Sequence, residues 1–536
     1  MPANRRQRHK PVTPLEANSS RSDTLAEADR AHLAKSYAEA IELYRLALGE
    51  NPSLFDAWYG LASASASRLE FGDAIAAYRR TLELRSHDAG LRVNLAEALF
   101  SLGHVSDAVR NYRIAAAADD AEVREMAVGN LACIAPGDPA LDDAMILDMR
   151  RCWAAQEAKR VRPCRRPRMA QNERLRIAYY GAFFAERNWM KMYMGVLNAH
   201  DRDRFEVNLI VDGALPTAAS GYVDRDNDRI WHVNGVPNAE LAEHIAAANI
   251  DVLIDLNGYS HKSRMPLLLY RAAPVQIAWN GMYGSTGFPD VDVLIADDTA
   301  LPCGEERHYS ERIYRVRHTY LPFQMFYETP DVTAPPSLQT GHITFGSLNS
   351  AYKLTPETLQ AWSRILHTIP TARLLLRNAA LDHVSNRADL LARFAGLNIA
   401  AERLSLLGRA DHMSFLRTYD QIDVALDAFP YNGGTTTVEA LWQGVPVLTI
   451  DGDRWAARTS RSILTAAGLA DWVAADLPSF VAKAAKLANA ELAPMRAAQR
   501  GRIAASPACD VASLCRELEE LYLRETEQKR ILDSAY

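Results

Sequence analysis

A run rich in glycine and threonine carries the clearest chemical signal in this sequence. It reads PYNGGTTTVE over residues 430–439, after an apolar strand-like stretch (422–429) and before a helix-like segment (438–443) that stops at Gly444. Glycines at a strand-to-helix turn let backbone amides approach a ligand closely. The helix start adds unpaired N–H groups and a partial positive charge, which together suit a phosphate or diphosphate.

The side chains of this run extend the prediction. Glu439, one turn into the helix, can accept hydrogen bonds from a ribose. The alternative is a glycine-rich turn with a threonine N-cap and no ligand, because such loops recur in many proteins. The candidate phosphate-binding residues are Gly433, Gly434, Thr435, Thr436 and Thr437.

Three other polar loops follow predicted strands and are expected at the same cleft. They span residues 255–264, 280–287 and 346–353. Lys353 places one cation just past a strand, where it can neutralise a leaving diphosphate. The alternative is an exposed lysine near a helix start, although the helix dipole disfavours a cation there. The other candidate binding residues of these loops are Asn257, Gly281, Tyr283, Asn349 and Ser350.

Metal and triad chemistry find little support in the sequence. The segments 290–292 and 451–453 each hold two aspartates, but solvated carboxylates are the favoured interpretation. His261 and His412 have no visible partner, so packing or surface roles are favoured for both. There is no Ser-His-Asp pattern and no Walker-type lysine loop, and no G-x-G-x-x-G opens a predicted sheet. We therefore predict no metal and no separate cofactor.

The elements that must position these loops form two predicted α/β domains, 173–332 and 333–536. Short runs rich in Val, Ile and Leu are typical of buried parallel strands, and they alternate with helix-like segments such as 357–367. Facing sheets of this kind leave a cleft at the carboxyl ends of their strands. A charged amphipathic helix, 511–531, is expected to pack back on the first domain. The candidate strands are 175–180, 205–210, 251–256, 275–279, 291–296, 343–348, 372–377, 403–407, 422–427 and 446–450.

The N-terminal third repeats itself every 34 residues. Small and aromatic residues recur in register, as in the triplets Ala40, Ala74, Ala108 and Tyr44, Tyr78, Tyr112. This period resembles the tetratricopeptide repeat, whose units are helix pairs. We expect a repeat array over 22–135 that ends in a capping helix near 122–134. Such arrays bind partner proteins on a concave face, and scaffolding alone is the alternative. A linker, 136–172, is expected to contain a helical stretch near 140–160 and carries the basic run 159–168.

Bulk properties exclude several classes. A chain of 536 residues is too long for one core. The net charge of −6 argues against a nucleic-acid binder, and no apolar run is long enough to span a membrane. Residues 1–21 form a basic tail that we expect to be disordered and that lacks the apolar stretch of a secretory signal. The six cysteines form no C-x-x-C pair, so a reduced, cytoplasmic protein is expected.

Taken in order, these features resemble a known family. The chain resembles bacterial members of the O-linked N-acetylglucosaminyltransferase (SPINDLY-like) family, with repeats followed by two Rossmann-like domains. The resemblance covers about residues 22–500. The matching segments are 254–259, 271–281, 349–353, 432–442 and 444–449.

The resemblance implies an inverting, metal-independent glycosyltransferase of the GT-B fold. The implied donor is a nucleotide sugar, usually a uridine diphosphate sugar, and the implied acceptor is a Ser or Thr hydroxyl on a protein. Lys353 matches the lysine that stabilises the departing diphosphate, and Thr435 and Thr436 match the helix start that binds its phosphates. Glu439 stands where the family commonly has an aspartate that contacts the ribose.

Three positions depart from the family pattern. Arg187 stands where a histidine often follows the first strand of the first domain. Ser350 replaces a glutamine, and Gly434 replaces a histidine that some members have in the Gly-Thr loop. An arginine near the sugar suits an acidic sugar, because guanidinium pairs bidentately with carboxylate. The exact nucleotide and the sugar stay open at this point.

The leading hypothesis is a protein O-glycosyltransferase whose repeats, 22–135, recruit the acceptor. Flagellin is a candidate acceptor, because some bacterial relatives are associated with flagellin modification. One alternative is a non-catalytic interaction protein with a degenerate GT-B part, which the missing histidine motivates. Another is a small-molecule glycosyltransferase that uses its repeats for assembly.

Overall fold

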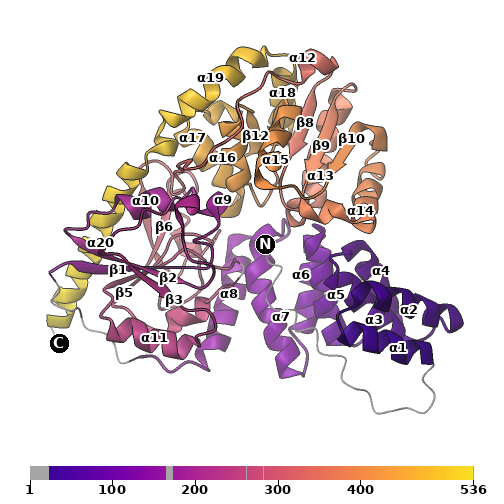
Figure 1. Cartoon of the computed structure of the whole chain (residues 1–536), viewed down its shortest axis with the longest axis horizontal. Helices are drawn as coiled ribbons and strands as arrows, with labels where there is room; N and C mark the ends of the chain where they lie inside the picture. Colours follow the sequence, from indigo (N-terminus) through magenta and orange to yellow (C-terminus); the bar gives the residue numbers. More distant parts are fainter. Residues whose placement is uncertain (1–22, 165–168, 170–172, 261, 282, 535–536) are drawn as a thin grey trace.

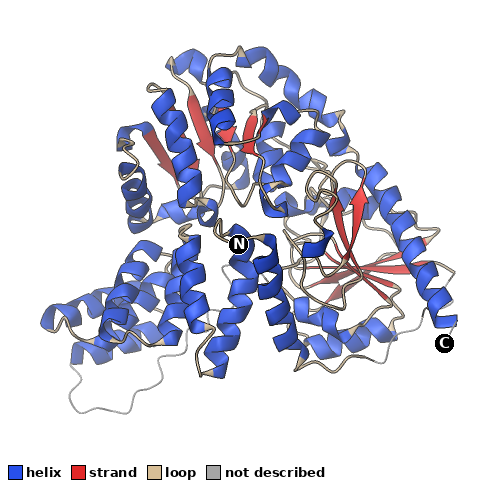
Figure 2. Cartoon of the chain, turned by 180° about the vertical axis from the view of Figure 1, so that it is seen from behind, coloured by secondary structure: helices blue, strands red, loops and turns tan. Residues whose placement is uncertain are grey.

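The computed structural model describes residues 23–164, 169, 173–260, 262–281 and 283–534. Three parts surround a common centre (Figure 1). A helical array comes first in the chain, a first sheet domain follows it, and a second sheet domain completes the fold. Helices dominate the array and cover the sheets of both domains (Figure 2).

The array consists of seven helices, in which neighbouring helices pack antiparallel to each other. The helices α2, α4 and α6 begin at Tyr37, Phe71 and Val105, which reproduces the predicted period. The predicted alanines and tyrosines are buried where these helices meet. The predicted capping helix is α7. The bounds are α1 Asp23–Leu33, α2 Tyr37–Glu50, α3 Phe55–Ser67, α4 Phe71–Leu84, α5 Ala89–Ser101, α6 Val105–Ala115 and α7 Ala121–Ile134.

The predicted linker contains the helical stretch expected near 140–160. A 3-10 turn, η1 (Ala135–Gly137), ends the array, and helix α8 (Asp143–Ala158) follows it. Trp153 of α8 is buried against Tyr259 and Phe288 of the first sheet domain. The segment therefore joins the array firmly to that domain.

The first sheet domain holds a seven-stranded sheet whose paired strands are all parallel, in the order β3-β2-β1-β4-β5-β6-β7. Its five inner strands are those that the sequence predicts. The two outer strands, β3 and β7, were not predicted, because both are short and their side chains are largely polar or exposed. The bounds are β1 Leu175–Gly181, β2 Phe205–Val211, β3 Arg229–His232, β4 Val252–Asp255, β5 Val275–Ala278, β6 Val293–Asp297 and β7 Arg312–Val316, with helices α9 Arg187–Met190, α10 Met194–Ala199 and α11 Asn238–Ala247.

The second sheet domain holds a six-stranded parallel sheet in the order β10-β9-β8-β11-β12-β13. The predicted strands are present, and β13 is an additional two-residue edge strand. Buried Leu, Ile and Phe side chains fill the space between this sheet and helices such as α13 and α18. The strands are β8 Thr344–Ser347, β9 Arg373–Arg377, β10 Leu404–Leu407, β11 Val424–Leu426, β12 Val447–Ile450 and β13 Val473–Ala474. The helices are α12 Ser337–Thr340, α13 Pro356–Thr368, α14 Val384–Ala395, α15 His412–Arg417, α16 Thr435–Trp442, α17 Thr459–Ala466, α18 Leu477–Ala488 and α19 Leu492–Ala504.

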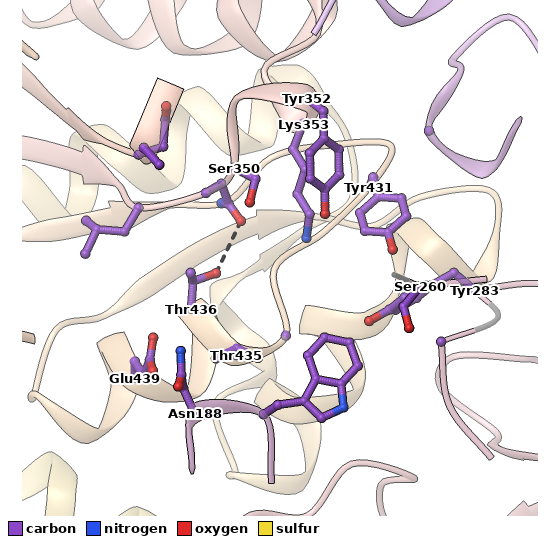
Figure 3. A pocket seen from close by; sticks show the side chains of 18 of the residues that line it. Asn188, Ser260, Tyr283, Ser350, Tyr352, Lys353, Tyr431, Thr435, Thr436 and Glu439 are labelled. Atoms are coloured by element: carbon purple, nitrogen blue, oxygen red, sulfur yellow. Dashed lines mark hydrogen bonds between the residues drawn. The ribbon is translucent and has the colours of Figure 1, made fainter. Parts of the chain in front are cut away.

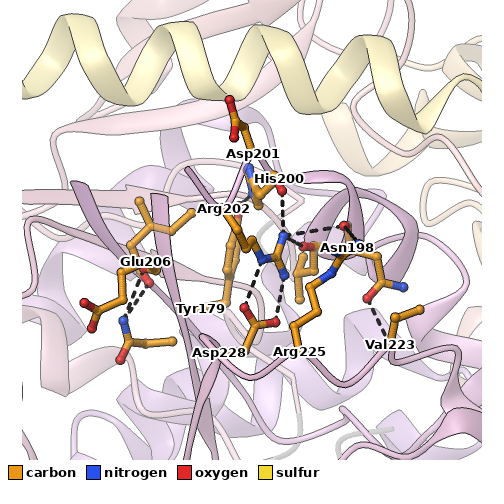
Figure 4. Close-up of polar contacts among 12 residues, drawn as sticks. Tyr179, Asn198, His200, Asp201, Arg202, Glu206, Val223, Arg225 and Asp228 are labelled. Carbon is orange, nitrogen blue, oxygen red and sulfur yellow. Dashed lines mark hydrogen bonds and ion pairs between the residues drawn. The ribbon is translucent and has the colours of Figure 1, made fainter. Parts of the chain in front are cut away.

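The last helix, α20 (Val511–Ser534), crosses back to the first sheet domain, as predicted. Its Tyr522 hydroxyl lies 3.0 Å from that of Tyr179 on β1. Its Glu519 accepts a hydrogen bond of 2.9 Å from Nδ1 of His200, which follows α10. Close by, Arg202 pairs with Asp228 and donates to backbone carbonyls at the end of α10, so it fixes the turn that carries His200 (Figure 4).

Among the described helices, none has both the length and the apolar content that crossing a bilayer requires.

Candidate active site

A cavity of about 480 Å³ lies where the array and the two sheet domains meet. The array contributes Phe100 and Ile134, the first domain contributes Ser260 and Tyr283, and the second contributes the loops that follow β8, β9, β10 and β11. These loops leave the carboxyl ends of parallel strands, where ligands bind in sheets of this kind. The volume is that of an ordinary small-molecule site.

The Gly-Thr loop is held in shape from behind. The carboxylate of Asp427, at the end of β11, accepts hydrogen bonds from the N–H of Gly433 (2.8 Å) and the hydroxyl of Thr449 (2.9 Å). A Cβ atom on Gly433 would lie 2.6 Å from the hydroxyl of Thr436, so only glycine fits there. Helix α16 begins two residues later with its first N–H groups at the cavity. The loop and helix together present the geometry of an anion site.

Lys353 reaches this loop from the opposite side of the cavity. It ends the short 3-10 helix η5 (Ala351–Lys353), and its Nζ donates a hydrogen bond of 2.6 Å to the carbonyl oxygen of Asn432. Burial lowers the pKa of Lys353 to about 8, and the nearby Asp427 opposes this shift. Figure 3 shows the Lys353 side chain pointing into the cavity above Thr435 and Thr436. A cation and a helix N-terminus therefore face the same space.

Asn349 and Thr436 link the two loops. The hydroxyl of Thr436 donates to Oδ1 of Asn349 over 3.2 Å (Figure 3). Asn349 is buried and also donates to the hydroxyl of Ser347. Both side chains are thereby oriented before any ligand is present.

Glu439 lies in the cavity wall one turn into α16, as the sequence predicts. Its Oε1 accepts a hydrogen bond of 2.5 Å from Nζ of Lys191, which belongs to the first domain. Both side chains are almost fully buried. Burial raises the pKa of Glu439 and lowers that of Lys191, while each charge opposes the shift of the other. Lys191 could not be predicted from the sequence, because the pair joins residues 248 positions apart.

Aromatic rings line the part of the cavity near the array. The rings of Tyr283 and Tyr431 lie 4.8 Å apart, and Tyr352 stacks on Phe100 at 5.2 Å. The ammonium of Lys353 lies 4.4 Å from the centre of the Tyr431 ring, within cation–π range. Burial raises the pKa of Tyr283 to about 12, so this hydroxyl stays neutral at pH 7. The rings form an uncharged wall beside the lysine.

The loops after β9 and β10 line another part of the cavity. They bring in Arg377, Asn378, Gly408 and His412. The Nε2 atom of His412 is buried and has no hydrogen-bond partner among the residues that the structure describes. Burial and the charges of Lys191 and Arg187 lower the pKa of His412 to about 4, so the ring is neutral. A flat neutral ring next to exposed backbone suits a planar heterocycle.

The structure brings most of the predicted site residues to the cavity and leaves others behind its wall. Gly433 and Thr437 shape the loop from behind, and Thr437 bonds to Ser460. Asn257 is fully buried and accepts a hydrogen bond from the N–H of Ala182. Arg187 lies over the ring of Tyr327, 5.3 Å from its centre, and its neighbours Asn188 and Trp189 line the cavity instead. The predicted residues on the cavity are Gly281, Tyr283, Asn349, Ser350, Lys353, Gly434, Thr435, Thr436 and Glu439.

The position of Arg187 bears on the sugar. An arginine contact to an acidic sugar requires the guanidinium to face the cavity, and here it faces Tyr327. The hypothesis of an acidic sugar therefore has no geometric support in this arrangement.

One group of potential metal ligands lies among the described residues. It consists of a ring nitrogen of His200 and, from α20, the sulfur of Cys515 and a carboxylate oxygen of Glu519. Hydrogen bonds already join them: His200 to Glu519 and Cys515 to both. None of the three lines the cavity.

Two parallel-sheet domains that face each other across an anion site define the GT-B class, and the helical array adds a tetratricopeptide-type module to it. The chain belongs to glycosyl transferase family 41, whose family model matches residues 159–327 and 334–518. The predicted family, fold class and enzyme class are thereby confirmed.

Several proteins that are similar to this chain have names that state an activity. A probable UDP-N-acetylglucosamine–peptide N-acetylglucosaminyltransferase SPINDLY of Arabidopsis thaliana is 32% identical over 337 residues, which is 61% of this chain and 36% of that protein. The corresponding protein SEC of the same plant is 26% identical over 365 residues, or 66% of this chain and 37% of SEC. The chain thus matches little more than a third of the length of these relatives.

A solved structure matches nearly the whole chain. It is a mutant O-GlcNAc transferase of Thermobaculum terrenum, with a TM-score of 0.80 and 28% identity. The match covers 95% of this chain and 98% of that structure, so the array and both sheet domains share one arrangement.

Proposed function

We propose that this protein transfers a sugar from a nucleotide-sugar donor, in the first place a uridine diphosphate sugar, to a Ser or Thr hydroxyl of a protein acceptor. The observation that carries the proposal is the placement of Lys353 opposite the N-terminus of α16. Two sources of positive charge face one another there, as a leaving diphosphate requires.

The chemistry follows from this placement. As the bond between the anomeric carbon and the diphosphate breaks, negative charge grows on the departing phosphate oxygens. The ammonium of Lys353, the first N–H groups of α16 and the hydroxyl of Thr435 stabilise that charge. The oxygen of an acceptor hydroxyl bonds to the anomeric carbon from the opposite face of the sugar as the bond to the diphosphate breaks, so the configuration inverts, and the hydroxyl proton passes to solvent or to the departing phosphate. The one carboxylate in the described lining, Glu439, is paired with Lys191, so leaving-group stabilisation supplies most of the rate.

The nucleoside occupies the far part of the cavity in this proposal. The base lies against His412 and the backbone at Gly408, and the ribose lies against Glu439. The neutral state of His412 supports this placement, because an uncharged ring packs on a base without a desolvation cost for charge.

The acceptor approaches along the array in this proposal. Ile134, Pro136 and Gly137, at the end of the array, belong to the cavity wall. A chain segment that leaves the array therefore meets the aromatic wall beside Lys353. Flagellin is one acceptor to be tried first. The absence of a disulfide between any of the six cysteines supports a reducing compartment, and we place the reaction in the cytoplasm.

The test is transfer of label from nucleotide sugars to proteins of the native cell extract. The protein and Lys353→Met are compared, with Lys486→Met, on the distant helix α18, as the matched control. Lys353→Met is expected to lose transfer by about 10²–10³-fold, while Lys486→Met keeps it. Chelator should leave the rate unchanged, because the charge on the diphosphate is met by protein groups. Label that appears only on small molecules would favour the small-molecule alternative, and no transfer with no nucleotide binding would overturn the proposal.

A further inference from the structure

The carboxylate of Glu439 has one oxygen engaged and one available. Its Oε1 accepts from Lys191, whereas the part of the chain that the structure describes offers no hydrogen-bond partner for Oε2. The side chain is only 2% exposed and belongs to the cavity lining. The available oxygen therefore faces the cavity, where a ligand can donate a hydrogen bond to it.

Lys191 is committed to this carboxylate. Its side chain is fully buried, and besides Glu439 its ammonium has only the hydroxyl of Tyr327, at 3.4 Å, as a partner within the described residues. The backbone carbonyl of Lys191 accepts from the N–H of Gln324 over 2.7 Å, which fixes the base of the side chain. A lysine held in this way sets both the charge and the orientation of the carboxylate.

The charge state decides what Glu439 can recognise. An ionised carboxylate accepts hydrogen bonds at both oxygens, whereas a protonated one has lost part of that capacity. Burial alone favours the protonated form, and the ammonium at 2.5 Å favours the ionised one. The vicinal diol of a ribose donates hydrogen bonds, and an ionised carboxylate accepts them more strongly than a protonated carboxyl does.

We propose that Lys191 is a positioning residue that holds Glu439 ready to bind the vicinal diol of the donor's ribose, so that selectivity for ribose depends on a residue of the other domain. The inference rests on the proposed nucleotide-sugar function and deepens it.

Calorimetry with ribose and 2′,3′-dideoxyribose forms of the same nucleoside diphosphate tests the proposal. Uridine, cytidine and guanosine diphosphates are first compared, and the tightest ligand supplies the pair of probes. The unaltered protein is expected to bind the ribose form at least about tenfold more tightly, because hydrogen bonds to a charged group are lost in the dideoxy form. In Lys191→Met the ratio should fall to within about twofold, with the affinity for the dideoxy form nearly unchanged.

Two further variants guard against misfolding and general loosening. Lys191→Met leaves a buried carboxylate without its partner, so Lys191→Met/Glu439→Gln provides a variant without a buried charge, and the same loss of selectivity is expected. Arg458→Met removes another ion pair between the domains, that with Glu305 at 2.8 Å, away from the cavity lining. It should lower the melting temperature and leave the ribose selectivity as it was.

The outcomes separate the inference from the proposed function. Folded Lys191 variants that keep the original selectivity would overturn the inference, as would equal binding of both probes by the unaltered protein. If the unaltered protein binds none of the nucleoside diphosphates, the proposed function fails and the inference fails with it.

Discussion

The Nζ of Lys353 lies 2.6 Å from the carbonyl oxygen of Asn432, so the cation of one loop is tied to the glycine turn of the other. The hydrogen bond holds the ammonium at the entrance to α16. A diphosphate that enters this space takes over the ammonium from a neutral carbonyl, and the cation needs little movement to meet it.

Activity should fall at alkaline pH because of Lys353. Burial lowers the pKa of this lysine to about 8, so its ammonium is present below pH 8 and is lost as the pH rises through that value. The rate at low donor concentration, kcat/KM, should therefore decline above about pH 8. A bound diphosphate favours the ammonium, so kcat should decline at a higher pH than kcat/KM.

The variant Lys353→Arg provides the control for this profile. A guanidinium keeps its charge at every accessible pH, so the alkaline decline should disappear even if the rate is lower. An unchanged alkaline limb in Lys353→Arg would assign the decline to another group.

Gly103→Ala should reduce transfer although the residue lies outside the cavity. Gly103, in the turn between α5 and α6, has φ of +86°, and a Cβ there would lie 2.5 Å from the carbonyl oxygen of Leu354. Leu354 follows Lys353 directly, so relief of the clash must move the lysine or the array. We expect a loss of stability of at least about 1 kcal/mol together with a lower rate, measured by denaturant unfolding and labelled transfer.

Gly235→Ala is the control for this prediction, because it introduces backbone strain without a steric clash. Gly235 has φ of +78° and no atom within 4 Å of the Cβ position. It should lose stability without a comparable loss of transfer. Equal effects of the two substitutions on the rate would contradict the coupling of Gly103 to Lys353.

Asn386→Ala should loosen the array from the second sheet domain. The buried side chain of Asn386 on α14 accepts from the N–H of Gly72 (2.9 Å) and donates to the carbonyl of Leu69 (2.9 Å). Loss of these hydrogen bonds should cost about 1–3 kcal/mol, because backbone groups are left unpaired. Protease should cleave Asn386→Ala faster in the segments where α4 and α14 meet. The exposed Asn489→Ala is the control. Identical cleavage patterns for the two variants would show that the array is held elsewhere.

The contact of α20 with the first domain should weaken in mild acid. Burial lowers the pKa of His200 below its ordinary value of 6.5, so the folded protein resists protonation of this ring more than the unfolded chain does. The free energy of unfolding should therefore be fully maintained above pH 6.5 and fall below it, by up to about 1.4 kcal/mol per pH unit.

Denaturant unfolding at pH 7.5 and pH 5.5 measures this loss. His200→Gln should lose less stability between the two values than the unaltered protein, because glutamine does not titrate. The exposed His87→Gln should behave as the unaltered protein does. A difference that survives unchanged in His200→Gln would place the acid sensitivity at other groups.

Much of the fold was predictable because its signals are periodic or local. The register of Ala40, Ala74 and Ala108 gave the array, and the apolar runs gave the inner strands of both sheets. The edge strand β3 was not predictable in this way, since only one of its sides pairs and its residues are mostly exposed. Helix α8 was predictable as a helical stretch near 140–160, but its packing on the first sheet domain through Trp153 was not.

The candidate active site was predictable where its residues lie in a single loop. It was not predictable where residues from distant parts of the chain come together. The Gly-Thr run and Lys353 could be predicted to meet at one cavity, because their residue types and their positions after strands are local signals. The roles of Lys191, His412 and the aromatic wall depend on contacts between domains. No local sequence pattern distinguishes these residues from others of their type. Arg187 was predicted near the sugar because of its position after the first strand of the first domain. The short helix α9 instead turns it toward Tyr327 and turns Trp189 toward the cavity.

Arg393 on α14 donates hydrogen bonds to the carbonyl of Leu102 in the array (2.7 Å) and to the carbonyl of Leu354 beside Lys353. One guanidinium thus holds together the helical array and the loop that carries Lys353. An engineer who wishes to redirect the enzyme by grafting a foreign repeat module must therefore retain the turn at 102–104. A fusion junction placed before that turn preserves the hydrogen bonds of Arg393, whereas one placed after it removes the bond to Leu102 and should displace Lys353.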